Sequence, residues 1–144
     1  MLDSGSGLGG GSMTNGGEQA DRAYGTAMTL FNQGSMTAAR AAFEDFLQQF
    51  PRDELAPQAH FKLADIKEQA EDLDGALEEF NRIPENFPQD RMVPDALYRS
   101  ALVHLLLDEE DNAARVLRRL INTWPDAPVT PLAQERLDEL GGLR

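Results

Sequence analysis

The side chains with the most obvious capacity for catalysis or metal binding are two histidines and several runs of carboxylates. Residues 72–75 (DLDG) resemble the start of a calcium-binding loop, in which carboxylates alternate before a glycine. With Gly75 as the sixth residue of such a loop, the first and twelfth would be Ala70 and Asn81, and neither is a carboxylate. We therefore expect the acidic runs to form a solvated charged face.

Catalysis would need a nucleophile and a base close together. His60 and His104 fall at different positions of the internal pattern described below, and we interpret them as a partly buried helix residue and a packing residue. The chain has no cysteine, which removes disulfides, thiolate metal sites and cysteine nucleophiles. The sequence predicts a protein that is not an enzyme and has no cofactor and no metal site.

Gly5, Gly7 and Gly10 match the spacing G-x-G-x-x-G of dinucleotide-binding loops. That motif needs a strand before it and a helix after it, and four preceding residues cannot supply the strand. Residues 1–19 are rich in Gly, Ser, Asn and Thr and offer little to bury. We expect this segment to be a flexible linker or an artificial junction that ends before Met13.

Three aromatic residues, Tyr24, Phe61 and Tyr98, lie 37 residues apart, and the same period runs through most of the chain. It relates Pro51, Pro88 and Pro125; Ala27, Ala64 and Ala101; Ala39, Ala76 and Ala113; Phe50, Phe87 and Trp124; and Pro57, Pro94 and Pro131. Small and large apolar residues at these places are typical of the tetratricopeptide repeat. The usual period of this repeat is 34 residues, so each unit here is three residues longer. The three extra residues fall between the proline that closes one unit and the proline that opens the next.

The repeat predicts an all-α fold from Ala20 to Leu140, a right-handed superhelix of three helix-turn-helix units followed by a capping helix. The units span about 20–53, 57–90 and 94–127, and the cap spans 131–141. Ala27 and Ala39 are expected where two helices of one unit cross closely, with Phe43 and Phe46 in the wedge between units.

Helix boundaries are also indicated by residue type. Thr37, Asp74 and Asp111 are expected N-caps of the second helix of each unit, because their side-chain oxygens can accept an unpaired backbone N–H. Pro57, Pro94 and Pro131 are expected at the first helical position.

The second unit departs from the pattern at two places. Pro84 removes a backbone donor inside a helix, so we expect a kink or a stop near Ile83. Lys67 replaces an apolar wall residue.

The candidate functional site is the inner groove lined by the first helix of each unit, with an aromatic residue at position five of every unit. The candidate binding residues are Tyr24, Met28, Phe31, Phe61, Asp65, Glu68, Tyr98, Leu102 and Leu105. Apolar anchors surrounded by acidic residues favour a protein segment of neutral to basic character. The alternative is that the three rings only pack against neighbouring helices.

The chain has 25 acidic and 13 basic residues and a formal net charge of −12, which disfavours nucleic acid and anionic membrane surfaces as partners. No apolar run approaches the roughly 20 residues needed to span a bilayer, so no membrane insertion is expected. The first residues lack the basic head and apolar middle of a secretory signal. The protein is therefore expected to be cytosolic unless a signal has been left out.

Several motifs together resemble a known family: the F-P and W-P endings of the units, the openings A-P-x-A at 56–59 and V-P-x-A at 93–96, and the closing AQERLDEL at 133–140. Over residues 20–140 they are similar to the C-terminal domain of the Tol-Pal system protein YbgF, also called the cell division coordinator CpoB. Related extended repeats occur in the BamD lipoprotein. The resemblance implies a periplasmic adaptor that contacts a Tol component and helps to coordinate peptidoglycan synthesis with outer-membrane constriction.

Three departures accompany this resemblance. The coiled coil and the signal peptide that precede the domain in the family are missing, and Lys67 stands where the family has an aromatic residue.

The alternatives to an envelope adaptor are other kinds of protein-binding module. A groove that clamps the carboxylate of a chaperone tail would need Lys and Asn at positions five and nine, which here hold Tyr24, Met28, Phe61 and Asp65. A generic cytosolic scaffold that binds a neutral-to-basic peptide is the second alternative, and a second copy of the chain is an alternative partner.

Overall fold

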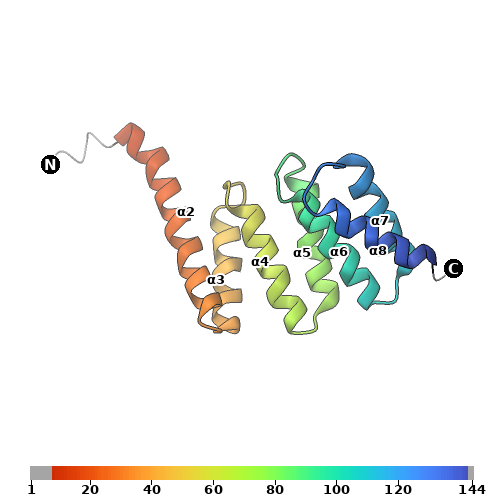
Figure 1. Cartoon of the computed structure of the whole chain (residues 1–144). Coiled ribbons are helices and arrows are strands. Elements are labelled where there is room, and N and C mark those ends of the chain that lie inside the picture. Colours follow the sequence, from red (N-terminus) through yellow and green to blue (C-terminus); the bar gives the residue numbers. More distant parts are fainter. Residues whose placement is uncertain (1–7, 143–144) are drawn as a thin grey trace. The chain divides into compact units, whose positions relative to one another are not determined.

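The computed structural model describes residues 8–142, and all regular structure in this range is helical (Figure 1). In chain order the helices are α2 (Leu8–Asn32), α3 (Met36–Gln49), α4 (Ala56–Gln69), α5 (Leu73–Asn86), α6 (Val93–Leu106), α7 (Glu110–Thr123) and α8 (Thr130–Gly142). No strand occurs in the described range, which confirms the predicted all-α class with three helix pairs and a final helix. By its internal contacts the chain divides into two compact parts, which are not the repeat units of the sequence. We call them the N-terminal unit, residues 1–59, and the C-terminal unit, residues 60–144.

The N-terminal unit is built on the packing of α2 against α3. Ala27 on α2 and Ala39 on α3 are fully buried, as expected for a close helix crossing. Phe43 and Phe46 are also fully buried and supply most of the large apolar surface.

The start of α2 differs from the expectation. The helix begins at Leu8, twelve residues before the predicted start at Ala20, so residues 8–19 are helical where a linker was predicted. Gly17, Glu18 and Gln19 are exposed, and Ala20 is the first buried side chain among residues 17–32. Helical hydrogen bonds are local and can extend beyond the packed part of a helix, which composition alone did not indicate. The predicted linker residues 1–7 lie outside the described range.

The C-terminal unit packs α5 on α6, α6 on α7 and α7 on α8. Its core repeats the alanine pattern, because Ala64, Ala76, Ala101 and Ala113 are all fully buried. The larger core residues at the predicted wedge positions, also fully buried, are Phe80, Ile83, Leu117 and Leu120.

The turn between the two helices of each repeat has the same geometry three times. Gly34, Glu71 and Asp108 have φ values of 79°, 63° and 60°. The backbone N–H of each bonds to the carbonyl three residues back, and the next N–H bonds to the carbonyl five residues before it. This pair of bonds is the Schellman motif, which satisfies carbonyls at the end of the first helix.

The predicted N-caps were wrong by two residues. The caps are Ser35, Asp72 and Glu109, and the turn fixes them because the residue after the left-handed position is the N-cap and the next helix begins one residue later. Only Asp72 among these three makes a side-chain cap bond, accepting from the Gly75 N–H at 3.0 Å.

The first helices of the second and third repeats and the final helix begin at Ala56, Val93 and Thr130, one residue before the predicted prolines. The prolines therefore stand at the second helical position, where a missing N–H is also harmless.

The predicted stop near Ile83 was wrong. Helix α5 continues through Pro84 to Asn86 and has 14 residues, as α3 and α7 do. Pro84 lies in the last turn, so only the Phe80 carbonyl loses its helical donor, and the Phe87 N–H still bonds to the Ile83 carbonyl at 2.8 Å. The proline ring is buried.

Candidate functional site

In the N-terminal unit the predicted groove residues lie on α2. Tyr24 is half-buried, and its ring meets Phe43 and Phe46 edge-on with both centroid distances at 5.8 Å. Burial raises the pKa of the Tyr24 hydroxyl. Met28 and Phe31 are half-buried as well. The Tyr24 ring is therefore partly used in packing, and the rest of its surface remains accessible.

In the C-terminal unit the predicted residues of α4 are engaged by a residue that was not predicted, Arg99 on α6. The Phe61 ring packs edge-on against Phe80 at 5.2 Å. The guanidinium carbon of Arg99 lies 5.3 Å from the centre of the Phe61 ring and 5.0 Å from that of Phe80. Arginine over aromatic rings gains a cation–π attraction, so Arg99 holds both rings in place.

Arg99 also binds the two acidic residues that were predicted to attract a basic partner. Its Nη2 donates to Asp65 Oδ1 at 2.5 Å and to Glu68 Oε1 at 3.1 Å. Burial lowers the pKa of Arg99, but Asp65 and Glu68 outweigh this effect and the net pKa is raised. The negative charge at this place is thus partly neutralised from within the unit.

The predicted groove residues of α6 are apolar. Tyr98, Leu102 and Leu105 are half-buried, and Leu106 is 58 % exposed. Tyr98 packs against the core and forms a side-chain hydrogen bond with Arg136 of α8, which raises the pKa of Arg136. Of these four residues, Leu106 contributes least to the fold and offers the most apolar surface to a partner.

A second cluster lies in the interior between α4 and α5, where Glu79 binds two basic side chains. Lys67 Nζ donates to Glu79 Oε2 at 2.9 Å, and His60 Nδ1 lies 2.8 Å from Glu79 Oε1. All three residues are buried. An ionised carboxylate only accepts hydrogen bonds, so His60 Nδ1 must carry a proton. We call His60, Lys67 and Glu79 the buried triad.

The charges of the buried triad depend on one another. Burial raises the pKa of Glu79, but the hydrogen bonds from His60 and Lys67 outweigh it and the net pKa is lowered. Arg82 Nε lies 3.9 Å from Glu79 Oε1 and adds a further positive charge at the edge. Lys67, which was predicted to be a misplaced wall residue, therefore has a buried partner.

The repeat contains a signal for this triad that the prediction missed. One period away, the three positions hold Ala23, Leu30 and Ala42 in the first repeat, and Leu97, His104 and Val116 in the third. Only the second repeat is polar at all three. A simultaneous change of three columns indicates a contact among them.

The second histidine, His104, was predicted to be a packing residue. Its Nδ1 lies 2.7 Å from Glu109 Oε1 across the turn between α6 and α7, and this hydrogen bond lowers the pKa of Glu109. Within residues 8–142, no three potential metal ligands of the His, Cys, Asp or Glu type come together. None of the helices described is both long and apolar enough to cross a membrane.

Comparison of the sequence with models of known protein families gives two matches. Two family models described as tetratricopeptide repeat match residues 24–91 and 95–127, which together are more than two thirds of the chain. A search of curated proteins gave no significant match.

Several solved structures have a similar fold. The N-terminal domain of stress-induced protein-1 (STI-1) from C. elegans matches with a TM-score of 0.73 and 11 % identity, over 86 % of this chain and 95 % of that one. The CopN-Scc3 complex matches with a TM-score of 0.64 and 18 % identity, over 88 % and 69 %. MamA matches with a TM-score of 0.62 and 19 % identity, over 85 % and 72 %.

Proposed function

Because the chain belongs to the tetratricopeptide repeat family, whose fold is a protein-interaction scaffold, we propose that it binds a segment of a protein partner through the groove residues of its first helices. The observation that carries this proposal is the apolar surface of α6. Leu106 is 58 % exposed beside the half-buried Tyr98, Leu102 and Leu105. An apolar surface of this kind on a folded domain is typical of a binding site. On the N-terminal unit, Tyr24, Met28 and Phe31 are the corresponding binding residues.

The partner segment is of neutral to weakly basic character. Arg99 already compensates Asp65 and Glu68, so the strongly basic partner that acidic composition alone would favour gains less there. Asp95, at position two of the third repeat unit and in the first turn of α6, adds an acidic group to the helix that carries the apolar residues, and desolvation raises its pKa. The apolar anchors supply most of the binding energy and the charges set the preference among partners.

The more specific proposal is an adaptor of the bacterial cell envelope. The unit endings in F-P and W-P, the openings at 56–59 and 93–96 and the closing helix sequence support the similarity to the YbgF or CpoB domain. On this proposal the protein works in the periplasm, contacts a Tol component and helps to coordinate outer-membrane constriction with peptidoglycan synthesis. A cytosolic scaffold for a neutral-to-basic peptide is the alternative.

The groove is tested by titrating purified soluble domains of Tol proteins against the chain and its variants by calorimetry. A site of this small area is expected to bind with a dissociation constant in the micromolar range, on the order of −8 kcal/mol. Leu106→Ser should weaken binding by about 1 to 2 kcal/mol, since an exposed apolar anchor is lost without loss of packing. Tyr98→Ala should weaken it similarly.

Phe87→Ala is the matched control, because Phe87 is also a half-buried ring but stands at the end of α5, outside the groove positions. Circular dichroism checks that each variant is helical. Unchanged affinity of folded Leu106→Ser and Tyr98→Ala would exclude the α6 groove. Binding to none of the Tol domains, with binding to a basic peptide retained, would favour the cytosolic alternative.

Substitution of Arg99 tests separately whether the charges of Asp65 and Glu68 contribute to binding. Arg99→Gln leaves Asp65 and Glu68 without their cation, so affinity for a basic peptide should rise and should fall more steeply with salt. The salt dependence of binding at two ionic strengths measures this. An unchanged salt dependence would show that these two carboxylates do not face the partner.

A further inference from the structure

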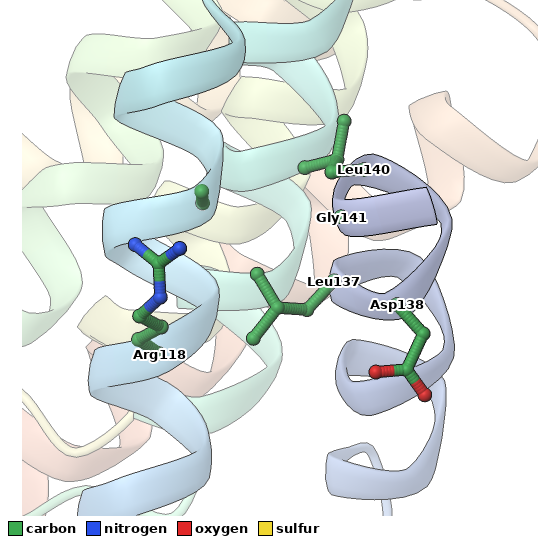
Figure 2. Close-up of a pocket in the computed structure, with 6 residues that line it drawn as sticks. Arg118, Leu137, Asp138, Leu140 and Gly141 are labelled. Carbon is green, nitrogen blue, oxygen red and sulfur yellow. The ribbon is translucent and has the colours of Figure 1, made fainter. Parts of the chain in front are cut away.

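A hollow of about 380 Å³ lies between α7 and α8 in the C-terminal unit (Figure 2). Its lining combines an apolar floor with charged edges: Ala114, Arg118, Leu137, Asp138, Leu140 and Gly141. Ala114 and Leu140 are buried, whereas Leu137 is half-buried and projects from α8 toward α7. The floor can therefore receive one more apolar side chain.

One arginine of α7, Arg118, lines this hollow, and two further arginines, Arg115 and Arg119, are close to it in the sequence of the same helix. Arg115, Arg118 and Arg119 are all exposed. Arg115 donates to Asn112, but Arg118 and Arg119 form no ion pair with any described residue. On the facing helix, Asp138 accepts a hydrogen bond from Gln134 and is not paired with Arg118. We call the three arginines together with the hollow the α7 arginine surface.

The corresponding surfaces of the other repeats lack this concentration of positive charge. The same three positions hold Ala41, Glu44 and Asp45 on α3, and Glu78, Asn81 and Arg82 on α5. On both of those helices an arginine pairs with a glutamate four residues away, Arg40 with Glu44 and Arg82 with Glu78. On α7, Arg118 and Arg119 have no such partner among the described residues, which is unusual in a chain whose formal net charge is −12.

Helix stability does not account for these arginines. The dipole of a helix favours positive charge within its last turn, and the last turn of α7 has no basic residue. Arg115 is three residues from Arg118 and four from Arg119, and like charges at these spacings destabilise a helix by about 0.2 to 0.5 kcal/mol per pair. The like charges of the three arginines repel one another, and a bound anion would relieve that repulsion.

We propose that the α7 arginine surface binds an acidic segment of a protein, with an apolar side chain of the segment in the hollow and its carboxylates on Arg118 and Arg119. Arginine suits this role because its guanidinium can bind a carboxylate through two parallel hydrogen bonds. The site differs from the α6 groove in both its helices and the charge of its partner.

The apolar floor favours a protein segment over a nucleic acid or free phosphate, because neither of these has an aliphatic side chain to bury over Leu137. The acidic net charge of the chain also repels a polyanion as long as nucleic acid. Charges are screened beyond about 8 Å at physiological salt, so a short acidic segment in the hollow interacts mainly with the charges nearest to it, the attractive Arg118 and the repulsive Asp138 of its lining.

The test uses a synthetic helical peptide of about four turns, with leucine at every third or fourth position and glutamate between. In two-dimensional NMR spectra of the ¹⁵N-labelled chain, the peptide should shift signals of α7 and α8 and leave those of α6 in place. A peptide with serine for leucine and inorganic phosphate alone should both give much smaller shifts. Equal shifts from phosphate or from the serine peptide would overturn the proposal, since the surface would then be a simple anion site.

Variants locate the binding. Arg118→Glu should weaken binding of the glutamate–leucine peptide at least about tenfold, because it removes one charge pair and adds a repulsive one. Arg91→Glu makes the same charge change at an exposed arginine in the loop before α6 and should leave the affinity within about twofold. Equal losses in the two variants would reduce the effect to net charge and overturn the proposal.

Leu137→Ala tests the hollow itself. This substitution should weaken binding of the glutamate–leucine peptide and leave the weak binding of the serine peptide unchanged. Thermal unfolding checks that the variant is folded. Leu106→Ser should have no effect on binding of this peptide, so failure of the α6 groove and failure of this site are distinguished.

Discussion

The second and third repeats place different chemistry at the same three interior positions. In the second repeat, Glu79 of α5 binds His60 and Lys67 of α4, and all three are buried. In the third repeat, the equivalent positions of α6 and α7 hold Leu97, His104 and Val116, of which Leu97 is buried in the apolar core. The helices that carry the two sets have the same length, 14 residues each.

The comparison shows that the same pair of helices can hold either a paired set of charges or a mostly apolar set at these positions. A buried ion pair is often no better than apolar residues of similar volume, whereas removal of one partner leaves an uncompensated charge in the interior. The repeat framework therefore constrains these three positions jointly, even though each of them taken alone varies freely among the repeats.

The largest expected effect comes from breaking the buried triad at its centre. Glu79→Val, which introduces the residue of the third repeat, leaves Lys67 and His60 buried without an acceptor. We expect a loss of about 3 to 5 kcal/mol in the free energy of unfolding. Urea unfolding followed by circular dichroism measures it.

The matched control replaces all three members of the buried triad, with the residues of the third repeat at positions 60 and 79 and that of the first repeat at position 67. The triple variant His60→Leu, Lys67→Leu, Glu79→Val should be at least as stable as the original chain, by up to about 4 kcal/mol. If the triple variant is as unstable as Glu79→Val alone, the loss is due to packing at position 79 and the comparison between the repeats fails.

Lowering the pH should reduce the stability that the buried triad contributes, and a chain with apolar residues at these positions should not show this loss. The net pKa of Glu79 is lowered in the folded chain. The unfolded state, where a glutamate has a pKa of about 4.3, therefore binds the proton more readily. The stability that Glu79 contributes is present above that value and is lost as the pH falls through it toward the folded pKa.

The measurement is the free energy of unfolding of the original chain and the triple variant between neutral pH and about pH 3. The original chain should lose more stability below about pH 5 than the triple variant. Parallel curves would show that Glu79 is not stabilised as a carboxylate. Glu109, whose pKa is also lowered, is present in both proteins and cancels in the difference.

A smaller effect compares the repeats at their turns. Glu71 and Asp108 occupy the left-handed position that Gly34 occupies in the first repeat. Glu71→Gly should stabilise the chain by up to about 1 kcal/mol, since glycine adopts this backbone without steric cost. Asp108→Gly should gain less, because aspartate tolerates the position better than glutamate.

The reverse change provides the control. A Cβ added at Gly34 would meet nothing within 4 Å, so Gly34→Ala should cost only the backbone strain, about 1 kcal/mol. Thermal unfolding of the three variants orders these effects. A destabilised Glu71→Gly would show that the Glu71 side chain contributes more than its backbone costs.

The sequence alone determined the helical class, the phase of the repeats and the alanine crossings. These features depend on local periodicity and residue size, and the pairs Ala27 with Ala39 and Ala101 with Ala113 are buried as the spacing predicts. It also placed the candidate binding residues on the first helix of each repeat, α2, α4 and α6, while their role in binding stays a prediction. The predicted N-caps lie two residues after the observed ones. The Schellman turn, and not the presence of a capping side chain, fixes where the next helix begins.

Only the tertiary structure decided which charges are free. Arg99 reaches Asp65 and Glu68 from a different repeat, 34 and 31 positions away in the chain, and Glu79 meets Lys67 across a turn. Arg118 and Arg119, by contrast, have no partner among the described residues. Composition counts all of these residues equally. Charge pairing depends on distances of a few ångströms between side chains of different helices, so it emerges only when the helices are packed.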